Sequence, residues 1–175
     1  MRGAPKLDRL DIRILAELQR NADLTNVVLA ETVGLSPSPC LARVKRLKQA
    51  GYITGYHARL NLAKLVEHIT VFTEVTLADH RREDFIRFEQ EIRRYDTLVE
   101  CHLVSGGYDY LLKFVARSVL RYQEMMEDIL ERRIGVDRYF SYIVIKSIFV
   151  RDGVPVTSLL DDGPNGTGDG PRFAG

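Results

Sequence analysis

The sequence predicts an α+β protein in which a helical N-terminal part precedes a C-terminal part that alternates strands and helices. Apolar residues recur at helical spacing up to residue 50, whereas β-branched runs and helical runs alternate after residue 67. The charge divides near the same place. Residues 1–60 hold ten Lys or Arg and five Asp or Glu, a net +5, and residues 61–175 hold 15 and 19, a net −4. Only the first part is therefore suited to a polyanionic partner.

The N-terminal part begins with two predicted helices. The first covers Leu7–Leu18, where leucine and isoleucine recur every three or four residues. The second is capped by Thr25 or Asn26 and ends at Gly34, because glycine readily takes the left-handed conformation that a sharp turn requires.

A third helix follows almost immediately and completes a helix-turn-helix. Ser36 is a good N-cap, and Pro37 and Pro39 fall in the first turn, where no amide hydrogen is missed. The helix ends before Gly51. Two short helices around a tight glycine turn, preceded by a third, are typical of a helix-turn-helix unit. Residues 52–60 alternate around a glycine and are interpreted as a small wing or a strand-like hinge.

The C-terminal part has a different period and predicts a small sheet. The expected elements are a strand at His68–Leu77, a helix at Glu83–Arg94, strands at Leu98–Val104 and Tyr108–Val115, a helix at Ser118–Arg132 and a strand at Tyr139–Val150. The resulting βαββαβ order favours a ferredoxin-like sheet with both helices on one face.

These elements divide the chain into four parts. We expect a winged helix-turn-helix domain at residues 1–54, a hinge strand or linker at 55–66, a ferredoxin-like domain at 67–156 and a disordered tail at 157–175. The tail is rich in Gly, Asp and Pro and has almost nothing to bury.

The third helix is the candidate DNA-binding element. Its four cations at positions 43, 45, 46 and 48 face no acidic residue in the same helix, so its outer face is expected to carry an unbalanced +4. The second helix of a helix-turn-helix enters the major groove with its N-terminal residues near the base edges. The alternative is a basic helix that is merely solvated. The candidate DNA-contacting residues are Ser36, Ser38, Pro39, Ala42, Arg43, Lys45, Arg46 and Gln49.

Several classes of protein find little support. Cys40 and Cys101 stand alone, without CxxC spacing, so no metal site and no disulfide framework is predicted. No cofactor-binding motif is present. The chain has no run of about 18 uncharged apolar residues and no signal-peptide pattern, so we expect no membrane association and a cytoplasmic location.

Two alternatives to a DNA-binding regulator are an enzyme and a pure interaction module. The best catalytic candidates, Cys101 and His102, are sequence neighbours on a strand and point to opposite faces, so they cannot pair as nucleophile and base. No catalytic residue is therefore predicted. An oligomeric metabolite buffer without DNA binding is the second alternative, and the intact basic helix argues against it.

Motifs in both halves resemble the Lrp/AsnC family of feast/famine regulators. They are LDRLD at 7–11, VGLSPSPC at 33–40, GYI at 51–53 and ECHLVSGGYDYLL at 100–112, and the resemblance runs from about Leu7 to Val150. It implies a DNA-binding domain joined by a hinge strand to a ferredoxin-like effector domain. It also implies homodimers formed through the sheets, often assembled further into octamers, with an amino acid or related metabolite bound between effector domains as the partner besides double-stranded DNA.

The resemblance further implies an effector site at the loop after the second strand and on the last strand. The matching residues are Ser105, Gly106, Gly107, Tyr108, Asp109, Tyr139 and Ser141. Adjacent glycines let backbone amides approach a carboxylate, and Asp109 is placed to meet an ammonium. Gly106-Gly107 is equally an ordinary hairpin turn. Tyr139 stands where relatives commonly have a small hydroxylated residue, so the pocket is expected to differ from one that accepts leucine.

Overall fold

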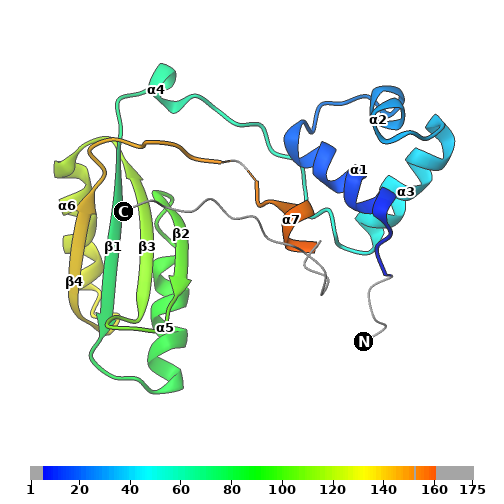
Figure 1. Cartoon of the computed structure of the whole chain (residues 1–175). Coiled ribbons are helices and arrows are strands. Elements are labelled where there is room, and N and C mark those ends of the chain that lie inside the picture. Colours follow the sequence, from blue (N-terminus) through cyan, green and yellow to red (C-terminus); the bar gives the residue numbers. More distant parts are fainter. Residues whose placement is uncertain (1–5, 152, 161–175) are drawn as a thin grey trace, which may run out of the picture. The chain divides into compact units, whose positions relative to one another are not determined.

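The computed structural model describes residues 6–151 and 153–160. The chain forms two compact units (Figure 1). Among the described residues, the helical unit contains those up to Arg59 together with those between Phe149 and Leu160, and the sheet unit is Leu60–Ile148. The boundaries expected from the sequence differ, because residues after 148 belong to the helical unit and not to the sheet unit.

The helical unit contains the three expected helices, α1 (Arg9–Arg20), α2 (Asn26–Val33) and α3 (Pro37–Gln49). Thr25 caps α2 by accepting a hydrogen bond from the amide of Val28, and Gly34 ends it in the left-handed conformation at φ +75°. The helices enclose one apolar core, whose buried members are Ile14, Leu18, Leu29, Ala30, Val33, Cys40, Val44 and Leu47. Cys40 is thus a fully buried member of this core.

The segment after α3 was expected to be a hinge strand or a linker, and the strand is not seen. Residues 53–61 form neither helix nor strand, so the hinge strand is absent from this part of the chain, and a four-residue helix, α4 (Leu62–Leu65), follows. An alternating pattern gives a strand only where a neighbouring strand takes its hydrogen bonds, and none of the described strands pairs with this segment.

The C-terminal segment also differs from the prediction. Disorder was expected from residue 157, but α7 (Val156–Leu160) is helical and packs against α1 within the helical unit. Residues 161–175 of the expected tail lie outside the described residues.

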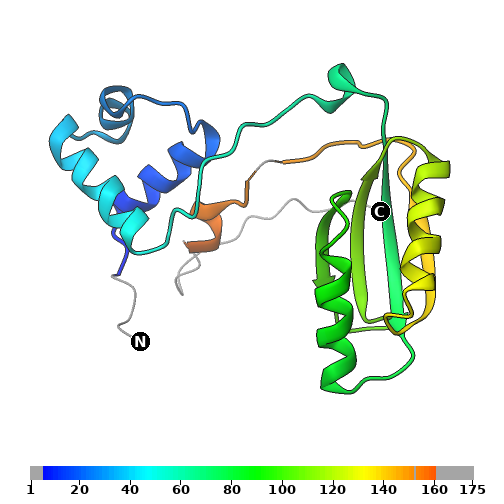
Figure 2. The same cartoon turned by 180° about the vertical axis from the view of Figure 1, so that it is seen from behind.

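The sheet unit confirms the βαββαβ order. Its elements are β1 (Ile69–Leu77), α5 (Arg82–Ile92), β2 (Leu98–Leu103), β3 (Tyr110–Ala116), α6 (Val119–Glu131) and β4 (Val136–Ile143). The strands pair antiparallel in the order β2-β3-β1-β4, and both helices cover one face of the sheet (Figures 1 and 2).

The last strand is displaced from its expected range, Tyr139–Val150. It pairs with β1 alone, and the amide of Val144 donates to the carbonyl of Thr70 near the beginning of that strand. Beyond this point β4 has no partner, so the apolar residues at 145–150 cannot extend it. The length of the neighbouring strand therefore sets the end of β4.

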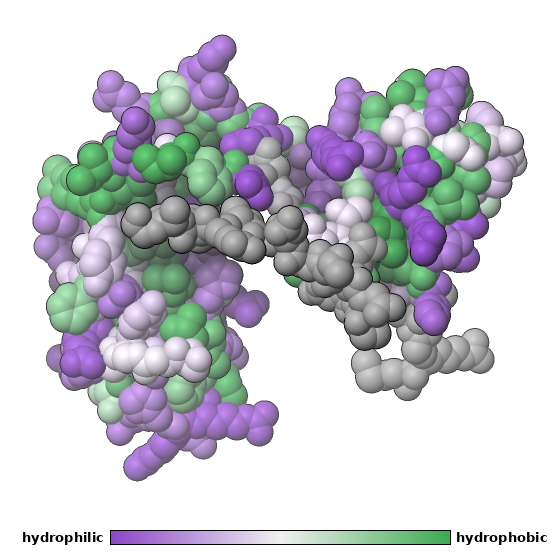
Figure 3. All heavy atoms as spheres, viewed as in Figure 1, coloured by the Kyte–Doolittle hydropathy of each residue, from purple (hydrophilic) through white to green (hydrophobic). Residues whose placement is uncertain are grey.

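The core of the sheet unit lies between the sheet and its two helices. Buried and half-buried residues alternate along β1 and β3, as expected for strands covered on one face. The buried polar residue Thr73 is hydrogen-bonded to the hydroxyl of Tyr122 at 2.8 Å. The opposite face carries exposed aromatic side chains, including Phe140 and Tyr142, and Figure 3 shows apolar side chains interspersed with polar ones there.

Candidate DNA interface and candidate effector site

The surface of α3 presents most of the residues predicted to contact DNA. Seven of the eight are exposed, and the eighth, Arg43, is half-buried. Leu41, an apolar residue of the same helix, is also 42% exposed. An apolar side chain there offers contact with a thymine methyl group.

Two of the four cations of α3 are engaged by acidic residues of α1. Arg43 Nη1 lies 2.6 Å from Asp8 Oδ2 and 2.8 Å from Asp11 Oδ1, and Arg46 Nη2 lies 2.5 Å from Asp11 Oδ2. The expectation of an unbalanced +4 face is therefore wrong. Sequence reasoning compared charges only within one helix, whereas the neutralising carboxylates lie more than 30 residues earlier.

We call these four residues, Asp8, Asp11, Arg43 and Arg46, the α1–α3 clasp. Asp11 is fully buried and accepts from both guanidinium groups. The hydrogen bond from Arg43 is the main cause that lowers the pKa of Asp8 below its ordinary value of 3.8. The same contact with Asp8 raises the pKa of Arg43. The clasp fixes the orientation of α3 on α1.

A second contact holds the first turn of α3. The side-chain amide of Asn26, at the start of α2, donates to the carbonyl of Pro37 at 2.7 Å. Sequence reasoning treated Asn26 only as a possible cap, and the spacing of 11 residues gives no local signal for this bond.

The remaining cations of α3 are available to phosphate. Lys45 is exposed and makes no ion pair with the described residues. Lys48 places its ammonium 4.6 Å from the ring centre of Tyr56. Arg46 is 47% exposed and has five N–H donors, one of which is shown bound to Asp11. The exposed face of α3 thus combines small residues near its N-terminus with cations further along.

The loop after β2 positions Asp109 against the end of β1. Asp109 Oδ2 accepts a hydrogen bond from the amide of Leu77 at 2.7 Å, and His80 Nε2 lies 3.0 Å from Oδ1. Gly106 has φ +151°, and a Cβ atom at Gly106 or Gly107 would meet nothing within 4 Å. The glycine backbone is therefore open to approach, in keeping with both the hairpin and the ligand interpretation. Ser105 and Tyr108 complete this loop.

The loop after β2 and the last strand both contact β1, from its two sides. The amide of Asp109 donates to the carbonyl of Val75, and Tyr139 of β4 is the register partner of the same Val75. Tyr139 is 37% exposed. Ser141 Oγ is hydrogen-bonded to the hydroxyl of Tyr122 at 2.5 Å. The Ser141 hydroxyl, which was predicted to contact the ligand, therefore already has a partner within the protein.

Two further features of the described residues bear on the possible chemistry. No group of three or more His, Cys, Asp or Glu side chains in the described ranges is arranged to hold a metal ion. None of the described helices is long and apolar enough to cross a bilayer.

Both units match known protein families. Residues 7–54 match the model of a winged helix-turn-helix DNA-binding domain, and residues 70–154 match that of the Lrp/AsnC ligand-binding domain. The chain is 44% identical to the transcriptional regulatory protein DoeX of Halomonas elongata over 143 residues, which cover 82% of this chain and 90% of that protein. It is 40% identical to the leucine-responsive regulatory protein of Escherichia coli over 84% of this chain and 90% of that one.

Solved structures show the same architecture. A transcriptional regulator of Neisseria meningitidis in complex with L-Met superimposes with a TM-score of 0.82 at 33% identity, covering 88% of this chain and 99% of that chain. An AsnC family regulator of Agrobacterium tumefaciens gives a TM-score of 0.82 at 29% identity, covering 87% of this chain and 99% of that chain. The protein therefore belongs to the Lrp/AsnC family of transcription regulators, with a helix-turn-helix for DNA and a C-terminal ligand-binding domain.

Proposed function

We propose that this protein regulates transcription as a homo-oligomer that reads DNA with the exposed face of α3 and responds to an amino acid bound at the loop after β2. The observation that best supports the DNA-binding role is that some residues of α3 contact α1 while others remain exposed. Arg43 and Arg46 brace the helix against α1, while Ser38, Ala42 and Lys45 are left exposed. A helix that is held by ion pairs on one side and exposed on the other is suited to binding in the major groove of DNA.

Each exposed position has a role that follows from its place on α3. Ser36, Ser38, Pro39 and Ala42 lie in the N-terminal half and approach the base edges, as the N-terminal residues of a recognition helix do. Lys45 and Gln49 lie further along and contact the backbone. Arg46 keeps donors for a phosphate or a guanine. Arg43 acts mainly as a positioning residue.

The DNA-binding role is tested by the salt dependence of binding. Duplexes enriched from a random-sequence library by the full chain are titrated by fluorescence anisotropy at several salt concentrations. Lys45→Ala weakens binding to all sequences and reduces the slope of log K against log salt by about 1, because one phosphate contact is lost. Lys64→Ala, an exposed lysine of α4, is the charge-matched control and leaves the slope unchanged. An unaltered slope in Lys45→Ala would exclude its phosphate contact.

The effector role is assigned to the loop and β4. An amino-acid carboxylate binds the open backbone at Gly106 and Gly107, and its ammonium binds Asp109 Oδ1 in exchange for His80. We assign Tyr139 of β4 to the same site, because its register partner is Val75, whose carbonyl accepts from the amide of Asp109. The Neisseria relative in complex with L-Met supports an amino acid as the class of ligand.

The effector is identified by thermal stabilisation of the full chain with each of the twenty amino acids and branched-chain keto acids. A ligand at 100 times its Kd adds about 2.7 kcal/mol to the free energy of unfolding. Asp109→Ala abolishes this stabilisation but keeps DNA binding without effector. An undiminished shift in Asp109→Ala would remove that residue from the site.

The protein acts in the cytoplasm as an assembly of dimers, without enzymatic activity. A helix-turn-helix gains affinity by spanning two half-sites one helical turn apart, which favours twofold symmetry. The exposed Phe140 and Tyr142 on the uncovered face of the sheet supply an apolar surface for pairing. Sedimentation analysis distinguishes dimers from octamers, and a monomer at all concentrations would contradict the assembly.

A further inference from the structure

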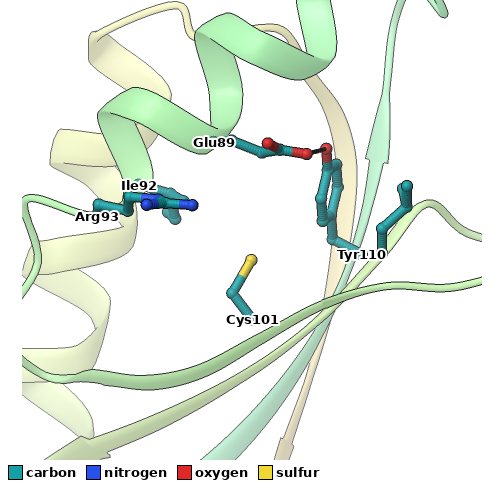
Figure 4. A pocket seen from close by; sticks show the side chains of 6 residues that line it. Glu89, Ile92, Arg93, Cys101 and Tyr110 are labelled. Atoms are coloured by element: carbon teal, nitrogen blue, oxygen red, sulfur yellow. Dashed lines mark hydrogen bonds between the residues drawn. The ribbon is translucent and has the colours of Figure 1, made fainter. Parts of the chain in front are cut away.

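A cavity separate from the candidate effector residues lies on the sheet unit, at the edge opposite β4. It has a volume of about 240 Å³ and opens between α5, β2 and β3 (Figure 4). It is lined by Glu89, Ile92, Arg93, Cys101, Leu103 and Tyr110. None of these residues belongs to the predicted effector site. We call it the α5–β2 pocket.

The pocket holds two opposite charges apart. Glu89 and Arg93 are four residues apart on helical backbone, in the order that favours an ion pair, yet no ion pair forms between them. Instead, Glu89 Oε1 accepts a hydrogen bond from the hydroxyl of Tyr110 at 2.9 Å (Figure 4). Tyr110 is only 1% exposed, so the core fixes its hydroxyl and thereby the carboxylate.

Arg93 carries the second charge of the pocket. Its backbone amide donates to the carbonyl of Glu91, but its guanidinium makes no hydrogen bond or ion pair with the described residues, although it lines the same cavity. The neighbouring Arg94, by contrast, is paired with Glu91 at 3.0 Å. The pocket thus offers a fixed anion and a free cation to a ligand that carries both charges.

We propose that the α5–β2 pocket is a second binding site, for a small α-amino acid with an apolar side chain. Glu89 receives the ammonium and Arg93 the carboxylate of the zwitterion. Charge-assisted hydrogen bonds of this kind are the strong ones in proteins, and a guanidinium matches a carboxylate in two-pronged geometry.

The rest of the lining selects the side chain. Ile92 and Leu103 are apolar, and the Cys101 thiol points into the space between the charged groups (Figure 4). Burial, and then the nearby Glu89, raise the pKa of Cys101 above its ordinary value, so the thiol is neutral at pH 7 and adds no third charge. The volume lies below the roughly 300–1,000 Å³ of sites for drug-sized ligands, which suits a metabolite of amino-acid size.

The reactivity of the Cys101 thiol allows binding in the α5–β2 pocket to be measured. Cys101 is exposed, whereas Cys40, the other cysteine of the chain, is fully buried. Alkylation of the native full chain with iodoacetamide near pH 8.5 therefore reports on Cys101, and mass spectrometry of its peptide gives the rate. The probes are L-alanine, L-valine, L-leucine and L-methionine. Two controls each lack one of the two charged groups: 4-methylpentanoate lacks the ammonium, and 3-methylbutylamine lacks the carboxylate.

At least one probe amino acid is expected to slow alkylation of Cys101 about tenfold at saturation, while the two single-charge analogues have no effect at the same concentration. Glu89→Gln keeps an acceptor for Tyr110 but removes the charge, and Arg93→Gln removes the cation. Each raises the concentration needed for protection about tenfold or more. Arg94→Gln, the matched control outside the pocket, leaves it unchanged.

Three results would overturn the proposal. They are the absence of protection by every probe, protection that persists unchanged in Glu89→Gln and Arg93→Gln, and loss of protection in Asp109→Ala. The last result would place the ligand at the loop after β2 and make the protection indirect. Protection that survives in Asp109→Ala, whether or not that variant still responds to an effector, supports a separate site, so this test and that of the proposed function fail independently.

Discussion

Asp11 is the residue on which the orientation of α3 depends most. Its fully buried carboxylate accepts from Arg43 and Arg46, and its own side chain also closes the capping box of α1 with Asp8. Removal of its charge leaves Arg46 without a carboxylate among the described residues and Arg43 with Asp8 alone. Loss of one partner of a buried pair costs more than the pair itself contributes. Asp11 acts through the helix that it holds and touches no ligand in the proposed function.

Asp11→Asn is expected to lower the free energy of unfolding by about 2 kcal/mol, because hydrogen bonds to charged groups contribute about 1.5–3 kcal/mol. It also weakens DNA binding. Urea denaturation followed by circular dichroism measures the first effect. Glu17→Gln on the same helix breaks only the surface pair with Arg20, and a loss below about 1 kcal/mol is expected there. Equal losses in the two variants would contradict the special role of the clasp.

The contact between Asp8 and Arg43 determines how the stability of the protein changes at acidic pH. Arg43 lowers the pKa of Asp8 in the folded state, so the folded protein holds the carboxylate ionised where the unfolded chain begins to protonate it. The stability from this contact is fully present above pH 3.8 and is lost as the pH falls through the lowered value. Thermal melting between pH 6 and 2 is expected to show a shallower decline in Asp8→Asn. Parallel profiles in the two proteins would exclude the contact.

At the scale of elements, α7 is the part of the helical unit with the least local support. It has five residues, and its sequence carries none of the long apolar periodicity that predicted the other helices. A cavity of about 520 Å³ is lined by Val156 and Leu160 together with Leu15 and Leu18 of α1. Contact with α1, and not helix propensity, therefore holds this segment.

Val156→Asp combined with Leu160→Asp is expected to destabilise the helical unit by about 1–2 kcal/mol, since Val156 is half-buried and Leu160 is 49% exposed. Amide hydrogen exchange in α1 measures the effect locally. Leu159→Asp is the matched control, because Leu159 is 61% exposed and outside the cavity. Unchanged exchange in the double variant would show that α7 does not stabilise α1.

Local sequence predicted the elements whose causes are local. The cap at Thr25, the turn at Gly34 and the alternation in β1 and β3 each depend on residues within a few positions, and all three are present. The end of β4, the absence of a hinge strand and the position of α7 depend on distant partners and were not predicted. The α1–α3 clasp was missed for the same reason, because its charges are 32 to 35 residues apart.

The candidate sites follow the same rule. The exposed face of α3 could be predicted because helical geometry alone places Ser38, Ala42 and Lys45 on one side. The hydrogen bonds that engage Asp109 and Ser141 come from Leu77 and Tyr122, on other elements, and gave no signal in the sequence. The α5–β2 pocket joins three elements and was likewise not visible.

At the scale of the whole molecule, the chain passes between the two units twice. It leaves the helical unit after Arg59 and returns to it at Phe149, so β4 is followed directly by the segment that ends in α7. The proposed effector contacts Tyr139 and Ser141 lie on β4. Regulation requires that the effector bind two assembly states with different affinity, and covalent continuity gives the signal one route to α1.

This connection predicts that a variant can still bind the effector while its DNA affinity responds less to it. In the Val156→Asp, Leu160→Asp double variant, the effector still raises the melting temperature of the sheet unit, but its influence on DNA affinity is reduced. Calorimetric titration with effector, with and without DNA, measures the coupling from both sides, since the factor must be reciprocal. An undiminished coupling factor would show that the signal does not pass through α7.

The central claim is that the protein binds a specific duplex through α3 and that an amino acid changes this binding. The most direct test is one anisotropy titration of the full chain against a library-enriched duplex and its scrambled version, at fixed salt, with and without each amino acid. We expect tighter binding of the enriched duplex and a shift of about 5- to 150-fold in its Kd with at least one amino acid. Equal affinity for the two duplexes, or no shift with any amino acid, would contradict the account.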